Sequence, residues 1–471
     1  MSDAAKSAAV EVVRTLRDHG HQAYLVGGCV RDLILGREPA DYDVATDARP
    51  DTVMRIFPET YAVGAQFGVV LVPISDHQIS GSPDRQTQEP TPDERDLARL
   101  SGAHAHHGVI EVATFRSDGL YTDGRHPDEV RFSQTAAEDV QRRDFTINGL
   151  LLDPLDGDRI LDYVGGRADL DAGILRTIGR AEQRFHEDKL RMLRAVRFAA
   201  RFGYEIEAQT FDAIRQLAPL IHQVSRERIR EELTRMLTEG HARRAFLLLD
   251  ETGLLHEVLP EIERMKGIEQ PPEFHPEGDV WVHTLLLLDK LAAGCSLTLA
   301  WGALLHDVGK PPTFRLAPDR IRFDGHVEVG VGMAREICRR LRFSNEDTEQ
   351  IAALVNNHMR FMDAPRMRES TLKRFLRMPQ FDEHLELHRI DCLSSHADLS
   401  LYEFARTRLA ETPAEEIRPK ALISGRELIA AGYEPGPRFK DILSAVEDGQ
   451  LEGRLASAEQ AMEFVLREFP Q

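Results

Sequence analysis

The chain has little cysteine and no long apolar run. Its cysteines are Cys29, Cys295, Cys338 and Cys392, which lie far apart and form no C-x-x-C pair. A disulfide framework or a zinc ribbon needs regularly spaced cysteines, so neither is expected, and a reducing cytoplasm fits this usage. The N-terminal residues lack the basic and apolar regions of a secretion signal, and no stretch approaches the roughly 18 apolar residues of a membrane span. These absences predict a cytoplasmic protein without a membrane partner.

An excess of basic residues is also missing. Lys and Arg number 59 against 78 Asp and Glu, which gives a net charge of -19 at pH 7. That balance argues against a protein that coats nucleic acid with its whole surface. Residues 176–244 differ from the rest, with 15 basic and 10 acidic side chains. This local balance fits a stripe that faces phosphates, and it equally fits ordinary solvated helix faces.

The length and the hydrophobic pattern predict several domains. A chain of 471 residues is too long for one core, and about three domains are expected. Up to about residue 152, short β-rich runs such as 69–74 and 109–115 alternate with helical pieces, whereas amphipathic helices follow after residue 175. Between the two β-rich runs, residues 75–107 are polar and without periodicity, which indicates an exposed insertion that joins the two strands.

The first candidate site is a glycine turn. The apolar run at 23–26 predicts a buried strand, and a helix is predicted to start near Val30, with Gly27 and Gly28 between them. Glycines at such a turn let the backbone approach a ligand, and the free N–H groups of a helix start favour an anion. Arg31 would add a charge-assisted contact to a phosphate. The turn therefore predicts a phosphate site, although two glycines alone are common at such turns.

Two aspartates sharpen this prediction. Asp41 and Asp43 are two positions apart, so on a strand both carboxylates would face the same side. Paired carboxylates repel each other unless a cation lies between them, and their hard oxygens suit Mg²⁺. An isolated pair would fit solvated surface acids, but beside a phosphate site it predicts metal-assisted phosphoryl or nucleotidyl transfer. Glu111, on a later predicted strand, is a candidate third carboxylate.

Three sequence motifs carry a resemblance to a known family. The chain reads LVGGCVRDLILG and DYDVAT at 25–46, RRDFTIN at 142–148, and EDKLRMLRAVRFAARFG at 187–203. In this order the motifs resemble the class II tRNA nucleotidyltransferase and poly(A) polymerase family of the polymerase β superfamily, over roughly residues 20–235. The resemblance implies an α+β fold, with a nucleotidyltransferase head that contains a small mixed β-sheet, followed by an all-α neck and body.

The resemblance also implies roles for individual residues. Asp41 and Asp43 would be catalytic and hold Mg²⁺, with Glu111 as a further candidate ligand. The implied nucleotide-binding set is Gly28, Arg31, Arg143, Asp144, Asn148, Asp188, Arg191, Arg194 and Arg197. On one predicted helix, Asp188 and Arg191 would be neighbours and Arg194 would follow. Arg197 falls on the opposite side of that helix, where a structural ion pair fits nearly as well as a nucleotide contact.

The implied base-reading pair, Asp188 and Arg191, makes chemical sense. Cytosine N4 and adenine N6 are amino donors, so a carboxylate accepts a hydrogen bond from either base, whereas uracil and guanine present a carbonyl oxygen there. Arginine donates to the ring acceptor beside that group. Two side chains would thus reject U and G without a nucleic-acid template. The choice between C and A needs something else, such as the shape of the pocket as the tRNA end grows.

The subtype is predicted from two further segments. Bacterial poly(A) polymerases usually carry a GRRFxxxHV-like stretch where this chain has VGAQFGVVLV at 63–72, and this departure favours CCA addition. The segment at 121–132, YTDGRHPDEVRF, resembles the flexible loop of enzymes that add the terminal A. The expected activity is therefore addition of C and A residues to tRNA 3′ ends from CTP and ATP. An A-adding enzyme and a poly(A) polymerase remain alternatives.

A second group of motifs resembles the HD metal-dependent phosphohydrolase superfamily. The segment LLHDVGKP at 304–311 carries an adjacent His-Asp pair. The metal ligands that the resemblance implies are His283, His306, Asp307 and Asp391, with His326 and His358 as further candidates. Imidazole and carboxylate together suit Mn²⁺, Ni²⁺, Fe or Zn²⁺ better than Mg²⁺. The domain would be a phosphohydrolase or a degenerate tRNA-binding module, so an HD phosphohydrolase with a vestigial RNA-binding head is an alternative function.

The predicted organisation follows from these motifs. We expect a nucleotidyltransferase head at 1–152 with a loop insertion at 75–107, a helical neck that binds the nucleobase and RNA at 153–270, an HD domain at 271–400 and a helical tail at 401–471. The expected partners are the tRNA 3′ end, CTP and ATP. The sequence identifies no protein partner.

Overall fold

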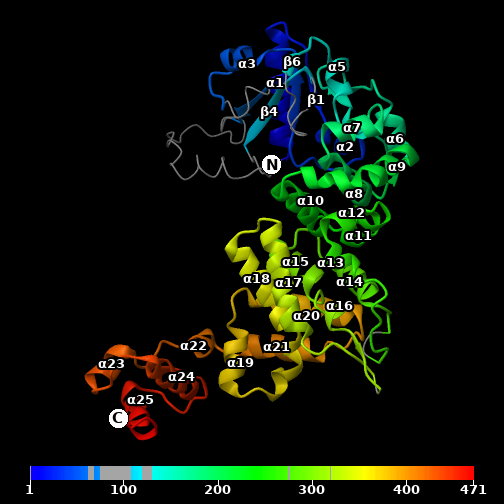
Figure 1. The fold of residues 1–471 in the computed structure, drawn as a ribbon. Helices are drawn as coiled ribbons and strands as arrows, with labels where there is room; N and C mark the ends of the chain where they lie inside the picture. The colour runs from blue at the N-terminus through cyan, green and yellow to red at the C-terminus, as the bar shows by residue number, and fades with distance from the viewer. Residues whose placement is uncertain are drawn as a thin grey trace. The chain divides into compact units, whose positions relative to one another are not determined.

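The computed structural model describes residues 2–61, 68–74, 108–118, 130–273, 276–318 and 320–470. The predicted insertion lies outside these residues, as does most of the 121–132 segment and half of the 63–72 segment. Contacts divide the chain into two compact units. One comprises 1–225 with 251–257, and the other 226–250 with 258–471 (Figure 1). The four-part division expected from the motifs stays a prediction.

The first unit is built on a six-stranded mixed sheet. Its strands, in spatial order, are β3 (Val69–Pro73), β4 (Val109–Thr114), β2 (Asp43–Thr46), β1 (Ala23–Val26), β7 (Leu151–Asp153) and β8 (Arg159–Leu161). β2 and β4 run parallel, and the other described neighbours in this sheet are antiparallel. The register places Asp43 opposite Val26 on one side and opposite Glu111 on the other. The small mixed sheet expected in the head is therefore confirmed.

Apolar residues on these short strands create the core of the head. Val26, Ala45 and Leu151 are buried, and they pack with Phe115 and Val140 in one cluster. Helix α1 (Ser2–Asp18) packs on β1 through a face that includes buried leucine and valine residues (Figure 1). The buried strand β1 ends at Val26, and α2 (Gly28–Ile34) begins two residues later. The glycine turn lies at this junction.

Helices continue the first unit beyond the sheet. They are α3 (Pro50–Ile56), α5 (Ala136–Gln141), η3 (Thr146–Asn148), α6 (Gly166–Ala172), α7 (Ala181–Glu187), α8 (Leu190–Phe202), α9 (Ala208–Leu217) and η4 (Ala218–Gln223). Two strand pairs were not predicted here: β5 (Arg116–Asp118) with β6 (Val130–Phe132), and β9 (Ile174–Leu175) with β10 (Glu205–Ile206). Strands of two or three residues are too short to show a period in the sequence.

The second unit is almost entirely helical. From residue 226 to the end of the HD region, its helices are α10 (Arg226–Thr238), α13 (Pro260–Glu263), α14 (Val280–Asp289), α15 (Leu297–Leu305), α16 (Lys310–Thr313), α17 (His326–Arg340), α18 (Asn345–Asn357), η5 (His358–Arg366), α19 (Glu369–Leu376) and α20 (Phe381–Ser394). α11 (Ala242–Glu251) and α12 (Leu254–Val258) cross the boundary between the units. α14 and α15 are apolar around most of their circumference, as expected for helices buried in a core. A small hairpin, β11 (Arg315–Leu316) with β12 (Ile321–Arg322), was not predicted.

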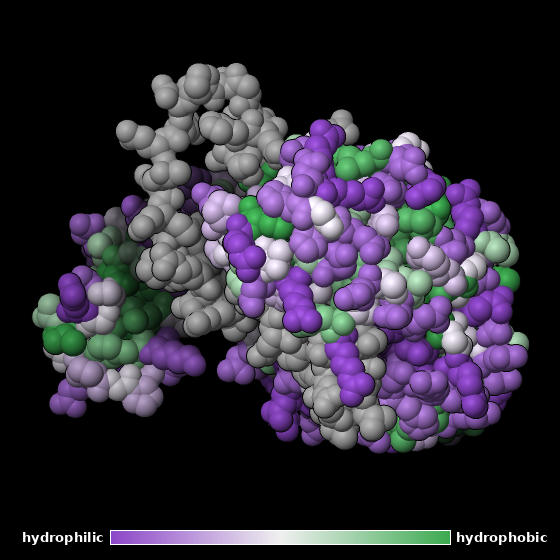
Figure 2. Space-filling model, turned by 90° about the horizontal axis from the view of Figure 1, so that it is seen from above, coloured by the Kyte–Doolittle hydropathy of each residue, from purple (hydrophilic) through white to green (hydrophobic). Residues whose placement is uncertain are grey.

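The C-terminal helices form a separate apolar cluster within the second unit. After α21 (Ser400–Glu411) and α22 (Ala414–Ile417), the helices are α23 (Gly425–Ala430), α24 (Pro437–Leu451) and α25 (Ala458–Glu468). Leu428, Ile442 and Val465 are among the buried residues that they share. None of the described helices is long and apolar enough to span a bilayer. On the face seen in Figure 2, hydrophilic side chains predominate and hydrophobic ones form small separate patches.

Candidate functional site

The first candidate site starts at the turn between β1 and α2. Gly27 has a φ of 77°, a conformation that glycine adopts without strain. A Cβ atom on Gly27 would lie 3.6 Å from Arg143 Nη1 and 3.8 Å from Asp43 Oδ2. A Cβ atom on Gly28 would lie 3.5 Å from Arg31 Nη2. The missing side chains therefore leave the backbone of the turn open beside two arginines and one carboxylate.

Three predicted carboxylates meet beside this turn. Asp43 is the first residue of β2 and stands in register with Glu111 on β4. Asp41 is exposed and precedes β2, so the prediction that both aspartates lie on the strand was wrong for Asp41. Burial, with the charges of Glu111 and Asp41, raises the pKa of Asp43 well above its ordinary value, and Arg143 opposes this rise. Carboxylates crowded in this way fit a site for a divalent cation.

Arg143 is held in place by a residue that the sequence reasoning did not single out. Asp139, on α5, accepts hydrogen bonds from Nε and Nη2 of Arg143 at 3.2 and 2.8 Å. It also accepts from Nε and Nη2 of Arg142 at 2.9 and 2.7 Å. The spacings of three and four residues on a helix were a visible signal for these ion pairs. Arg143 thus presents its remaining nitrogen, Nη1, to the glycine turn.

A chain of hydrogen bonds joins the three sequence motifs. Arg31 Nη1 donates to Asn148 Oδ1 at 2.6 Å, and Asn148 Nδ2 donates to Asp144 Oδ1 at 3.1 Å. Asp144 Oδ2 then accepts from Nε and Nη2 of Arg194 at 3.0 and 2.8 Å. Asp32, which the sequence reasoning also missed, accepts from Arg31 Nε at 2.9 Å. Four predicted site residues, from three separate segments of the sequence, are therefore directly connected.

Two aromatic rings on α8, the buried Phe198 and the partly buried Phe202, support the arginines of this network. The guanidinium groups of Arg31, Arg194 and Arg197 lie 5.5, 5.1 and 4.3 Å from the centre of the Phe198 ring. Phe202 stacks on Phe198 with ring centres 6.1 Å apart, and Arg31 lies 4.5 Å from its centre. Such cation–π contacts fix the planes of the guanidinium groups. Arg197 is buried, and its role as a nucleotide contact stays a prediction.

Asp188 and Arg191 lie where α7 gives way to α8. Asp188 ends α7 with an extended backbone, and α8 starts at Leu190, so the prediction that Asp188 shares a helix with Arg191 was wrong. The Oδ1 atom of Asp188 accepts from the Leu190 N–H at 3.0 Å, as a side chain at a helix start does. Arg191 Nη1 donates to Glu187 Oε2 at 2.8 Å, and its Nη2 donates to the Arg142 carbonyl at 3.1 Å. Glu187 was also missed, although it is four residues before Arg191.

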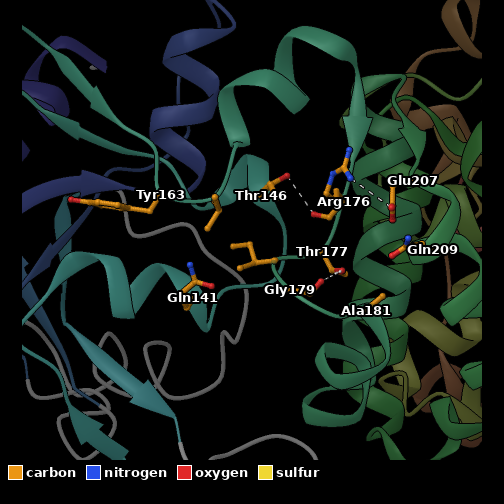
Figure 3. Close-up of a pocket in the computed structure, with 11 residues that line it drawn as sticks. Gln141, Thr146, Tyr163, Arg176, Thr177, Gly179, Ala181, Glu207 and Gln209 are labelled. Atoms are coloured by element: carbon orange, nitrogen blue, oxygen red, sulfur yellow. Dashed lines mark hydrogen bonds and ion pairs between the residues drawn. The ribbon is translucent and has the colours of Figure 1, made fainter.

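A cavity of about 290 Å³ lies in the same unit but is lined by other residues. Figure 3 shows Arg176 and Glu207 as an ion pair in its wall, with Thr177 and Tyr163 among the lining side chains. Arg176 Nε is also 3.1 Å from Asp169 Oδ2. The Thr177 hydroxyl donates to the Gly179 carbonyl. These polar groups are satisfied by one another, and no predicted site residue lines the cavity, so we do not assign it to the nucleotide.

The second candidate site lies among the helices of the HD region. Each of four histidines has Nδ1 bonded to an oxygen: His283 to Glu277, His306 to the Ala303 carbonyl, His326 to the Phe323 carbonyl and His358 to the Val355 carbonyl, at 2.7 to 3.0 Å. These bonds fix each ring so that Nε2 is available to a metal. In the described part of the chain, the buried Nε2 atoms of His306, His326 and His358 find no hydrogen-bond partner.

Two aspartates complete this cluster. Asp307 lies within 4.0 Å of all four histidine Nε2 atoms, and the shortest of these distances is 3.1 Å, to His306. Asp391 Oδ1 lies 3.1 Å from His283 Nε2. The six groups form two triads of close ligand atoms: His283, His306 and Asp391, and Asp307, His326 and His358. All six residues predicted for this site are therefore brought together.

The histidines of this cluster differ in pKa. Burial alone would lower the pKa of His283, but hydrogen bonds that its ring donates to the carboxylates of Asp391 and Glu277 raise it to about 9. Burial and the neighbouring His306 lower the pKa of His358 to about 4. Lys310, also buried, lies 2.7 Å from Asp307 and donates to Gln270 at 2.6 Å. Unsatisfied imidazole nitrogens beside buried carboxylates fit divalent transition metals.

Family models match most of the chain. The poly(A) polymerase head domain matches residues 23–101 and 93–176, and the probable RNA- and SrmB-binding site of polymerase A matches 203–266. The HD domain matches 280–395. The predicted HD region is therefore confirmed as a family match, as is the resemblance of the N-terminal half.

Relatives and solved structures agree with these matches. A CCA-adding enzyme of Geobacillus stearothermophilus is 41% identical over 247 residues, which is 52% of this chain and 53% of the relative. One of Bacillus pumilus is 36% identical over 302 residues, which is 64% of this chain and 63% of the relative. The matched region spans about half the length of the first of these relatives. The crystal structure of the Bacillus stearothermophilus CCA-adding enzyme in complex with CTP has a TM-score of 0.69 at 27% identity and covers 97% of both chains.

Proposed function

Because the chain belongs to the class II tRNA nucleotidyltransferase and poly(A) polymerase family, we propose that it adds C and A residues to tRNA 3′ ends from CTP and ATP without a nucleic-acid template. The observation that carries this proposal is the meeting of Arg143 Nη1, Asp43 and the open Gly27 turn at one place. Such a place offers cationic donors and metal-binding oxygens to one triphosphate. The similarity to CCA-adding enzymes supports CTP and ATP as its substrates.

We assign the head carboxylates to a divalent cation. Asp41 and Asp43 would hold Mg²⁺, with Glu111 as a further ligand, and the crowding that raises the pKa of Asp43 supports this assignment. A bound divalent cation neutralises phosphate charge and stabilises the attacking and leaving oxygens of the displacement. The tRNA 3′-hydroxyl would attack the α-phosphate, and pyrophosphate would leave.

The remaining predicted residues would orient the nucleotide. Gly28 and Arg31 would bind the triphosphate, and the Arg31 Nη2 position beside Gly28 supports this role. Asp144, Asn148 and Arg194 would hold that arginine and the nucleotide in register through their shared hydrogen bonds. A bound triphosphate close to these fixed donors needs little reorganisation before it reacts.

Base selection would belong to Asp188 and Arg191. Both lie at the junction of α7 and α8, and the Arg191 guanidinium is tied to the Arg142 carbonyl, one residue from Arg143. This connection supports a base-reading pair placed next to the triphosphate site. The pair would accept C and A and reject U and G, for the donor and acceptor reasons given above. The tRNA backbone would follow the basic segment 176–244, so binding should weaken as salt increases.

The proposal is tested with three tRNA substrates and two nucleotides. tRNA that ends at the discriminator base, at C or at CC is incubated with the protein, Mg²⁺ and CTP, ATP or both, and the products are sequenced. If the protein is a CCA-adding enzyme, tRNA that ends at the discriminator base is completed to CCA only when both nucleotides are present. Activity on the CC end alone would indicate an A-adding enzyme, and long A tails would indicate a poly(A) polymerase. If no RNA is extended, and Asp41→Ala behaves like the parent, the HD phosphohydrolase alternative is left.

We infer a second activity at the HD cluster. His283, His306 and Asp391 would hold one metal, and Asp307, His326 and His358 a second, as the unsatisfied Nε2 atoms support. Mn²⁺, Ni²⁺, Fe or Zn²⁺ at this ligand set would polarise a phosphate and activate a water molecule. The substrate would be a phosphoester at a tRNA end. Release of phosphate or ring-opening of a cyclic phosphate at an RNA end, with each metal added in turn, tests this inference against a purely RNA-binding role.

A further inference from the structure

We propose that Asp139 is a positioning residue that orients Arg143 toward the triphosphate. This inference rests on the proposed nucleotidyl transfer. Asp139 would not touch the substrate, since its side chain is 1% exposed and both of its oxygens are occupied by guanidinium groups. It would act through Arg143, while the bonds that it accepts from Arg142 and from the Arg116 N–H keep the carboxylate itself in place.

The geometry around Arg143 gives the first argument. One oxygen of Asp139, Oδ2, accepts from both Nε and Nη2, and these two charge-assisted bonds orient the guanidinium group. Nη1 is then directed to the turn, 3.6 Å from where a Gly27 Cβ atom would lie, on the same side as Asp43 Oδ2. An arginine on a flexible stem would sample many other positions. The buried carboxylate therefore selects the position in which Arg143 faces the nucleotide.

Arg142 and Arg116 give the second argument. The Arg142 side chain is held by Asp139, and the Arg142 carbonyl accepts from Arg191 Nη2 at 3.1 Å. The backbone N–H of Arg116, just past the end of β4, donates to Asp139 Oδ1 at 3.2 Å. β4 also carries Glu111. One carboxylate thus connects the strand of a candidate metal ligand, the triphosphate arginine and the base-reading arginine.

Asp139→Asn separates positioning from folding most directly. The amide keeps the size of the side chain, but its nitrogen is a donor that faces arginine donors, so only one oxygen still accepts. Misplacing a binding group by about 1 Å can cost a large factor in activity, and we expect the KM for CTP and ATP to rise roughly 10-fold or more with a smaller change in kcat. Asp153→Asn is the matched control, because Asp153, the last residue of β7, is about equally buried and pairs with Arg17 at 2.8 Å.

A double variant tests whether Asp139 acts through Arg143. In an Arg143→Ala background, Asp139→Asn is expected to raise the KM for CTP by less than about 2-fold, because the group that it positions is gone. If the fold-increases in KM caused by the two substitutions multiply in the double variant, the proposal is overturned. A folded Asp139→Asn variant with the KM of the parent would also overturn it. If Asp139→Asn loses its native circular dichroism, Asp139→Glu replaces it, and the same rise in KM and the same loss of effect without Arg143 are required.

Binding of CTP separates this inference from the proposed function. Calorimetry measures the Kd for CTP in the absence of tRNA, for the parent, Asp139→Asn and Asp153→Asn. If the parent binds CTP but does not extend tRNA, the proposed function fails, while a Kd raised roughly 10-fold in Asp139→Asn alone still supports the positioning role. Equal Kd values in all three proteins would overturn it.

Discussion

Asp144 is largely shielded from solvent, with a side chain 11% exposed, and its negative charge is balanced by hydrogen bonds and nearby arginines. Burial raises its pKa, but Arg194, Asn148 and Arg191 together lower it to about 2 from an ordinary value of 3.8. Because the folded pKa is the lower one, the charge stabilises the fold above pH 3.8, and this stabilisation is lost as pH falls toward 2. Its size is about 2 kcal/mol.

We therefore expect Asp144→Asn to be less stable than the parent by about 2 kcal/mol at pH 7 and by clearly less at pH 3. Urea unfolding of both proteins at the two pH values measures this. A stability difference that is the same at pH 3 and pH 7 would contradict the assigned charge interaction.

The negative charge of Asp43, unlike that of Asp144, is disfavoured by its surroundings, because Glu111 and Asp41 lie beside it. Replacing it with asparagine removes a partly buried charge that its neighbours repel, so in buffer with EDTA the melting temperature of Asp43→Asn should rise by roughly 2 °C or more. The same variant should lose nucleotide addition by a factor of roughly 1,000 or more. Differential scanning calorimetry and single-turnover assays test both. A variant that melts below the parent without metal would show that the three carboxylates do not repel one another.

Some partners of these residues were visible in the sequence and others were not. Asp139 with Arg143, and Glu187 with Arg191, are four residues apart on or next to a helix, so helical spacing alone indicates their ion pairs. Arg31 and Asn148 are 117 positions apart, and no local pattern connects them. Their contact depends on β1 and β7 being neighbours in the sheet, which is a property of the tertiary fold.

At the scale of elements, α8 is the helix on which the arginine network rests. Phe198→Leu would remove the ring beneath Arg31, Arg194 and Arg197, and we expect kcat/KM for both nucleotides to fall roughly 10-fold. Phe115→Leu is the control, because Phe115 is fully buried in the core of the same unit and stacks on Tyr24 instead. Equal losses of activity in the two variants, at matched thermal stability, would show that α8 contributes packing and nothing more.

The boundaries of elements were harder to predict than their existence. The motif around 187–203 was expected to be one helix, but the chain breaks it at Asp188, where the backbone is extended. That break places the Asp188 carboxylate at the start of α8, on the Leu190 N–H, and not on the side of the helix. The β-strand carrying Asp43 was predicted correctly, and the short pairs β9–β10 and β11–β12 were not, because strands this short carry no period.

For the whole molecule, the account predicts two sites that work independently. His306→Ala should lose metal bound in the HD cluster, as measured by mass spectrometry of the purified protein, because it removes one of three ligands in its triad. Nucleotide addition should change by less than about 2-fold. His384→Gln is the control, because His384 is buried on α20 outside both triads. Loss of nucleotide addition in His306→Ala, with native melting, would contradict the independence of the two sites.

The HD cluster shows how far a motif can be extended without a structure. The adjacent His306 and Asp307 specified the class of site, and order along the chain was enough to nominate Asp391, which proves to lie 3.1 Å from His283 Nε2. Glu277 could not be identified from the sequence, because it lies on a loop and its contact with His283 Nδ1 depends on how that loop folds. The resemblance to the HD pattern thus predicted the ligands, while the residues that orient them required the tertiary fold.

Template-independent choice of C and A is the central claim, and one measurement tests it directly. tRNA ending at the discriminator base is incubated with the protein, Mg²⁺ and all four nucleoside triphosphates at equal concentration, and single product molecules are sequenced. The account predicts that products end in CCA and extend no further, and that Asp188→Ala adds U and G as well. A parent enzyme that appends long A tails, or that adds U and G as readily as C and A, would contradict it.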